Sequence, residues 1–195
     1  DRRHIQDRDV VDLKSKLKTK MNLEMAATDE MLKIASEISP EDCCLVPEKR
    51  QELTTEGGLD VASQLSRMKD VCEQLRSNSI KASLFIDADM RQIDAAAECK
   101  APVIEIHTGH YADATNQKDI ELELKKIIEA CEYAHSLGIQ VNAGHGLTLE
   151  NTSAIAKIDS IVELNIGHSI ISRALFVGLA NATSEMKALL LEARG

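Results

Sequence analysis

Two stretches of the sequence place a histidine beside glycine just after an apolar segment. The first is Val-Asn-Ala-Gly-His-Gly at residues 141–146, and the second has Gly167 and His168 directly after the run 161–166. Glycine lets the backbone approach a ligand closely, and backbone N–H groups at the start of a helix bind phosphate well. Barrels of parallel strands commonly build phosphate sites in such places. The two stretches therefore predict a phosphate-binding site with histidines beside it.

Polar and apolar side chains alternate along five of the six strands that the sequence predicts. Side chains two residues apart share a face of a strand, so Glu105 and His107 lie on one face and Ile104 and Ile106 on the other. An open doubly wound sheet requires two apolar faces. The alternation instead favours a closed barrel with helices outside and a polar interior. The predicted strands are residues 21–25, 43–46, 81–87, 103–107, 139–141 and 161–166.

Segments of helical period separate these strands, which is the pattern of a parallel α/β fold. We find no linker, so we expect one (β/α) barrel domain over residues 1–195. A (β/α)8 barrel has eight strands, and a sheet of six would leave two edges unpaired. We therefore expect an N-terminally incomplete barrel that lacks the first one to two strands.

The composition argues against several classes of protein. Asp and Glu total 32 against 23 Lys and Arg, for a net charge of -9, so we expect neither nucleic acid nor a membrane surface as a partner. No apolar run approaches the roughly 20 residues that span a bilayer, and we do not expect a signal peptide. The 5 cysteines lack the C-x-x-C spacing of metal sites. We interpret them as reduced, mostly buried thiols of a cytoplasmic protein.

Eight polar residues fall near the carboxyl ends of predicted strands, where a barrel enzyme places its catalytic groups. Partly buried glutamates and histidines that titrate near neutrality share general acid and base roles. A structural ion pair or a core hydrogen bond is the alternative role for each. The candidates are Glu24, Asp87, Glu105, His107, Asn142, His145, Asn165 and His168.

Two absent features narrow the chemistry further. No predicted strand ends in lysine, which disfavours a Schiff base to the protein. No Gly-x-Gly-x-x-Gly follows a predicted strand, which disfavours a dinucleotide, and we expect no cofactor. A metal site is an open alternative, and its ligands would be Glu105, His107, His145 and His168.

At these residues the chain resembles the pyridoxine 5'-phosphate synthase family. The resemblance covers essentially the whole chain and is carried by eight stretches. They are residues 1–5 (DRRHI), 21–25 (MNLEM), 43–50 (CCLVPEKR), 54–61 (TTEGGLDV), 85–89 (FIDAD), 104–109 (IEIHTG), 142–147 (NAGHGL) and 163–168 (ELNIGH).

The resemblance implies a (β/α)8 TIM barrel with extra helices, assembled as a homo-octamer. It implies an enzyme that condenses 3-amino-2-oxopropyl phosphate with 1-deoxy-D-xylulose 5-phosphate. The products are pyridoxine 5'-phosphate, phosphate and water, and no redox cofactor takes part. The partners implied are therefore small phosphorylated substrates and further copies of the chain.

The resemblance also implies roles for individual residues. Glu24 matches a proton acceptor, His145 the proton donor, and Glu105 the group that stabilises the transition state. Family members carry two further motifs ahead of the position of Asp1, Asn-x-Asp-His and His-x-Arg, and the histidine of the second is another proton acceptor. The implied substrate contacts are His4 and Thr54 for the deoxyxylulose phosphate, and Gly146, Gly167 and His168 for the amino-ketone phosphate or the product.

Three alternative functions stay open at this point. The chain is another phosphosugar barrel enzyme, such as an isomerase or lyase, if other products form. It is a non-catalytic or truncated barrel fragment if it binds phosphate esters without turnover. It is a metal hydrolase if it holds a stoichiometric metal ion.

Overall fold

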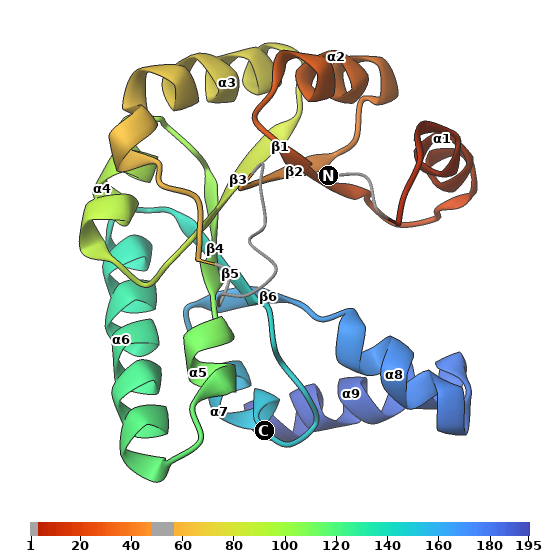
Figure 1. Ribbon diagram of the computed structural model, residues 1–195, viewed down its shortest axis with the longest axis vertical. Coiled ribbons are helices and arrows are strands. Elements are labelled where there is room, and N and C mark those ends of the chain that lie inside the picture. Colours follow the sequence, from red (N-terminus) through yellow and green to blue (C-terminus); the bar gives the residue numbers. More distant parts are fainter. Residues whose placement is uncertain (1–3, 48–56) are drawn as a thin grey trace.

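The computed structural model describes residues 4–47 and 57–195, and its centre is a curled sheet of six parallel strands (Figure 1). Each strand pairs with the next one along the chain. All six strands predicted from the sequence are present. They are β1 (Asn22–Ala26), β2 (Asp42–Val46), β3 (Lys81–Ile86), β4 (Val103–His107), β5 (Gln140–Gly144) and β6 (Ile161–Asn165).

Helices connect the strands and cover the outside of the sheet. In Figure 1, α2, α3, α4 and α6 follow one another around its outer side, and α8 lies against α9. The helices are α1 (Asp7–Lys16), α2 (Asp29–Ile38), the short 3-10 helix η1 (Ala62–Gln64), α3 (Leu65–Ser77), α4 (Met90–Glu98), α5 (Gly109–Asp113), α6 (Gln117–Ser136), α7 (Thr152–Ala156), α8 (His168–Val177) and α9 (Leu179–Arg194).

Short polar side chains fix where three of these helices begin. Thr28, Asp89 and Asn116 precede α2, α4 and α6, and each side chain accepts a hydrogen bond from a backbone N–H of the first turn, at 3.3, 2.9 and 3.0 Å. Such caps satisfy backbone donors that have no partner inside the helix and contribute about 1 kcal/mol each. The caps therefore help to fix the residue at which each helix begins after the preceding strand.

The apolar core lies between the sheet and these helices. Leu84, Ile86, Ile104 and Ile106 alternate along β3 and β4 on the outer face, and all four have 0% of their surface exposed. Glu105 and His107 point to the opposite face, inside the curl. The alternation predicted from the sequence is therefore confirmed in β3 and β4, and the polar side chains of β4 are directed inward.

All five cysteines are free and buried, as interpreted from the sequence. They are Cys43 and Cys44 in β2, Cys72 in α3, Cys99 after α4 and Cys131 in α6. No helix in the described part of the chain is both long enough and apolar enough to cross a membrane.

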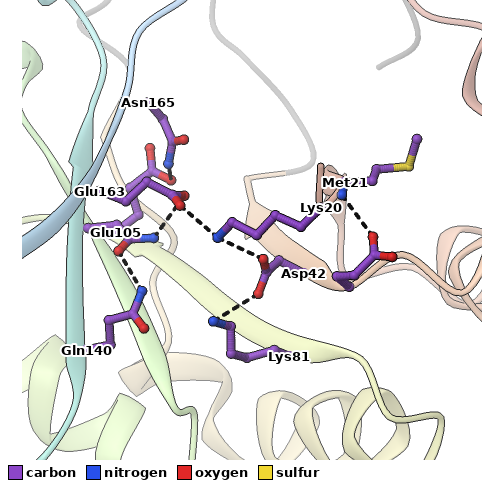
Figure 2. Close-up of polar contacts among 10 residues, drawn as sticks. Lys20, Met21, Asp42, Lys81, Glu105, Gln140, Glu163 and Asn165 are labelled. Atoms are coloured by element: carbon purple, nitrogen blue, oxygen red, sulfur yellow. Dashed lines mark hydrogen bonds and ion pairs between the residues drawn. The ribbon is translucent and has the colours of Figure 1, made fainter. Parts of the chain in front are cut away.

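An ion-pair network connects the two ends of the sheet (Figure 2). Lys20, just before β1, places Nζ 2.9 Å from Asp42 Oδ2 in β2 and 2.7 Å from Glu163 Oε2 in β6. Lys81 Nζ lies 3.1 Å from Asp42 Oδ1. The hydrogen bonds to Glu163 and Asp42 raise the pKa of Lys20, although burial opposes this. Because β1 and β6 are the first and last strands of the sheet, these ion pairs help to hold the curl.

We predict that Lys20→Met lowers the free energy of unfolding by about 1–2 kcal/mol, because it removes the cation that joins Asp42 to Glu163. Urea unfolding followed by circular dichroism at neutral pH measures this. Lys18→Met is the matched control, because Lys18 is exposed and has no ion pair among the residues described. Equal losses in the two variants would contradict a structural role for the network.

Candidate active site

Glu105 lies in the interior of the curled sheet with only 4% of its surface exposed. Its Oε2 accepts a hydrogen bond from Asn165 Nδ2 at 2.7 Å (Figure 2) and one from the Cys44 thiol at 3.5 Å. Because Asn165 ends β6 and Cys44 belongs to β2, this carboxylate connects three strands. The sequence predicted Asn165 at the site but gave no sign that the Cys44 thiol contacts it.

Two glycines of the first Gly-His stretch make room for neighbouring atoms. A β-carbon on Gly144 would lie 2.5 Å from Glu105 Oε1 and 2.8 Å from the Asn165 carbonyl oxygen. Gly146 has a φ of +73°, and a β-carbon there would lie 2.6 Å from the Ala112 side chain. Gly144 therefore permits the close approach of a carboxylate of the protein itself.

The environment of Glu105 raises its pKa to about 7. Burial is the largest cause, followed by the negative charge of Glu24, while the hydrogen bonds from Asn165 and Cys44 lower it. Glu24 lies in β1 opposite Cys44 and is exposed. The structure thus brings together two of the predicted catalytic residues, and one of them exchanges a proton near neutral pH.

His107 ends β4 and is buried, with its Nδ1 2.9 Å from Asp87 Oδ1. The same Asp87 oxygen accepts a hydrogen bond from the backbone N–H of Gly58 at 3.0 Å. Burial acts to raise the pKa of Asp87, but the hydrogen bonds from His107 and Gly58 outweigh it, so that the pKa lies below its usual value. Asp87 is therefore ionised at neutral pH.

His145 follows β5 with a left-handed backbone, at a φ of +84°. The Thr108 hydroxyl lies 2.6 Å from the His145 carbonyl oxygen and 2.7 Å from that of Gly144, which steadies this uncommon conformation. The centroids of the His145 and His107 rings are 4.9 Å apart, and Phe85 contacts both rings. Thr108 is a residue of the site that the sequence analysis missed, because only its place after a strand distinguishes it.

The second Gly-His stretch forms the start of α8. Gly167 precedes this helix of 10 residues, and His168 is its first residue. The backbone N–H groups of the first turn favour anions. His168, Thr148 and Arg173 line a cavity of about 390 Å³ beside that turn. Arg173 is already engaged by Glu185 through its Nε and Nη2 atoms, at 2.8 and 3.1 Å.

Of the two predicted contacts to the deoxyxylulose phosphate, His4 and Thr54, the structure describes His4. His4 is exposed and precedes α1 by three residues. Thr54 lies outside the residues that the structure describes.

Among the residues that the structure describes, the four predicted metal ligands do not come together as one site. Within residues 4–47 and 57–195, one set of side chains has ligand atoms within 4.8 Å of one another, namely Asp87, His107 and His110. Only His107 belongs to the predicted set. The hydrogen bond between His107 and Asp87 already uses one atom of each.

The inside of the curled sheet carries a pair of glutamates near histidines, at one end of the parallel strands. This arrangement is typical of an α/β enzyme with an acid-base site. A family model described as "Pyridoxal phosphate biosynthesis protein PdxJ" matches residues 1–192, so the chain belongs to this family. One curated relative, named "Pyridoxine 5'-phosphate synthase", comes from Photobacterium profundum. It is 60% identical over 194 residues, which cover 100% of this chain and 80% of the relative.

A comparison with solved structures supports the fold alone. The YdjI aldolase from Escherichia coli K12 superimposes with a TM-score of 0.56 at 11% identity, over 96% of this chain and 71% of the aldolase. At this identity the likeness carries no information about the reaction.

We predict that Glu105 makes the stability of the protein depend on pH. Because its pKa is raised from 4.5 to about 7 in the folded protein, the folded state holds the proton more tightly than the unfolded state. This stabilisation is complete below pH 4.5 and is lost as pH rises through about 7. Its size is about 1–3 kcal/mol.

The measurement is the free energy of unfolding from pH 5 to 8, compared between the wild type and Glu105→Gln. The wild type should lose stability relative to the variant as pH rises, because glutamine does not titrate. Parallel curves for the two proteins would show that Glu105 does not titrate in this range.

Proposed function

We propose that this chain condenses 3-amino-2-oxopropyl phosphate with 1-deoxy-D-xylulose 5-phosphate to give pyridoxine 5'-phosphate, phosphate and water, in vitamin B6 biosynthesis. The observation that carries the proposal is the buried Glu105, with a pKa of about 7 beside Glu24, in a chain 60% identical to a relative named pyridoxine 5'-phosphate synthase. The reaction requires repeated proton transfers, and such a pair of carboxylates supplies groups for them.

Glu105 is the group we assign to transition-state stabilisation. Condensation of an amine with a ketone develops positive charge on nitrogen, and a carboxylate in a water-poor interior stabilises that charge strongly. A nearby cation also favours ionisation of the carboxyl group. Binding of the substrate amine therefore converts Glu105 from a partly protonated acid to the anion that this step needs.

Glu24 and His145 are the groups we assign to proton transfer. Glu24 is exposed, so a proton that it accepts can pass to solvent. His145 lies at the carboxyl end of β5, on a backbone that Thr108 steadies, and serves as the proton donor. Glu24 lies on β1 and His145 directly follows β5, so the two groups come from different parts of the sheet.

We expect the protein to bind its substrates mainly through their phosphate groups. Gly167 and His168 provide the start of α8, and Gly146 follows His145 with a left-handed backbone at a φ of +73°. These residues bind the amino-ketone phosphate or the product in our proposal, while His4 and Thr54 contact the deoxyxylulose phosphate. The first turn of α8 supplies N–H groups suited to an anion.

The proposal extends to the architecture. The curled sheet belongs to one (β/α)8 barrel domain with extra helices, and the active molecule is a cytoplasmic homo-octamer. The curl supports the barrel, since polar side chains fill its inside and helices cover its outside. Sedimentation equilibrium measures the assembly, and a monomer at all concentrations would contradict the octamer.

We predict that His145→Ala and Glu24→Gln each lower kcat by about 10²-fold or more, because each removes a proton-transfer group. The assay is formation of pyridoxine 5'-phosphate from the two substrates. His135→Ala and Glu37→Gln are the matched controls, because both residues are exposed on the outer helices α6 and α2.

Near-normal turnover in either site variant would contradict its assigned role. Binding of both phosphate esters without any product would favour the non-catalytic fragment. A different product from the same substrates would favour another phosphosugar enzyme.

A further inference from the structure

His107 is a buried histidine at the site to which no role has been assigned above. Its side chain is 0% exposed, and its Nε2 has no hydrogen-bond partner among the residues described. A buried polar atom without a partner is uncommon in folded proteins and requires an explanation. The inward face of β4 therefore carries a second ionisable group, two residues beyond Glu105.

The contacts of Asp87 decide which nitrogen of His107 carries the proton. Asp87 Oδ1 accepts a hydrogen bond from the Gly58 N–H and lies 2.9 Å from His107 Nδ1. An ionised carboxylate only accepts hydrogen bonds, so the proton of a neutral His107 ring is on Nδ1. His107 Nε2 is then a buried acceptor with a free lone pair.

The ring of His145 lies beside that acceptor. A β-carbon built on Gly109 would lie 2.4 Å from His107 Nε2 and 3.1 Å from His145 Cδ2, so both atoms border the same small space. The ring centroids are 4.9 Å apart and the rings are inclined by 60°. Gly109 keeps this space free of a side chain.

We propose that His107 is a positioning residue that acts through His145. Asp87 fixes the tautomer of His107, and His107 Nε2 accepts a hydrogen bond from the protonated His145 ring. The contact orients His145 toward the substrate and favours its protonated form until the proton is donated. This inference rests on the proposed function, in which His145 is the proton donor.

Other charged groups near His107 come from α5 and α6. The ring of His110 packs against that of His107 at a centroid distance of 5.4 Å. Glu123 and Lys126 border the same cavity and form an ion pair at 2.7 Å, which largely cancels their charges. All of these groups are retained in the His107 variants below, so they do not account for a difference between those variants.

Two substitutions separate the roles of the two ring nitrogens. In His107→Asn, the amide reaches the position of Nδ1 and still donates to Asp87, but nothing replaces Nε2. In His107→Gln, the longer amide reaches the position of Nε2. We expect His107→Asn to lower kcat about 10-fold with a KM within about 2-fold of the wild type, and His107→Gln to recover part of the loss.

The kcat–pH profile is the readout that a purely structural role would not move. Activity that needs a protonated His145 declines at high pH, and loss of the acceptor should shift this decline in His107→Asn toward lower pH by about half a unit or more. His110→Asn is the matched control, because His110 is exposed and contacts the His107 ring but has no assigned role. Wild-type kcat and an unshifted profile in His107→Asn would overturn the inference.

A spectroscopic test does not depend on turnover. In ¹⁵N spectra of the imidazole groups, assigned with His107→Asn, we expect His107 to be protonated at Nδ1 and unprotonated at Nε2 near neutral pH. The opposite tautomer would overturn the inference whether or not the enzyme is active. If the wild-type protein makes no product, the proposed function is refuted, whereas the tautomer of His107 tests the inference by itself. Failure of the function and failure of the inference are therefore distinguishable.

Discussion

The burial of the Glu105 carboxylate is the constraint on which the rest of the site depends. A carboxylate removed from water is costly unless hydrogen bonds and space are provided for it. Asn165 on β6 and Cys44 on β2 provide the hydrogen bonds, and Gly144 on β5 provides the space. Since these residues come from three strands, the carboxylate is satisfied only when the sheet curls. The network centred on Lys20 holds the same curl nearer the amino ends of the strands.

The inner face of the sheet is organised in levels along the strands. Asp42 begins β2 and interacts with Lys20, Glu105 is level with Asn142 and Glu163 across β4, β5 and β6, and His107 and His145 lie at the carboxyl end. The ion-paired Asp42 thus precedes the level of Glu105, and the two histidines follow it.

The sequence predicted the fold better than it predicted the contacts. Alternation identified the inward faces of five strands, because the period of a strand does not depend on its neighbours, and the short apolar run 43–46 located the sixth. The sequence also predicted that Glu24 and Glu105 belong to one site. It did not reveal the Cys44 thiol at Glu105 or the Thr108 hydroxyl at His145, since both contacts join residues more than 30 positions apart. The family resemblance supplied roles, but not the pairing of Asp87 with His107.

The buried cysteines give the molecule a set of internal reporters. Burial raises the pKa of Cys43 and Cys131 to about 12, and that of Cys44 above its usual value. The thiolate is the reactive form of cysteine. Each of these thiols therefore does not react with an alkylating reagent while its helix or strand stays packed in the fold. Its rate of alkylation therefore measures how often that part of the fold opens. Cys44 reports on the opening of the sheet at Glu105, and Cys131 on the detachment of α6, in the unmodified protein.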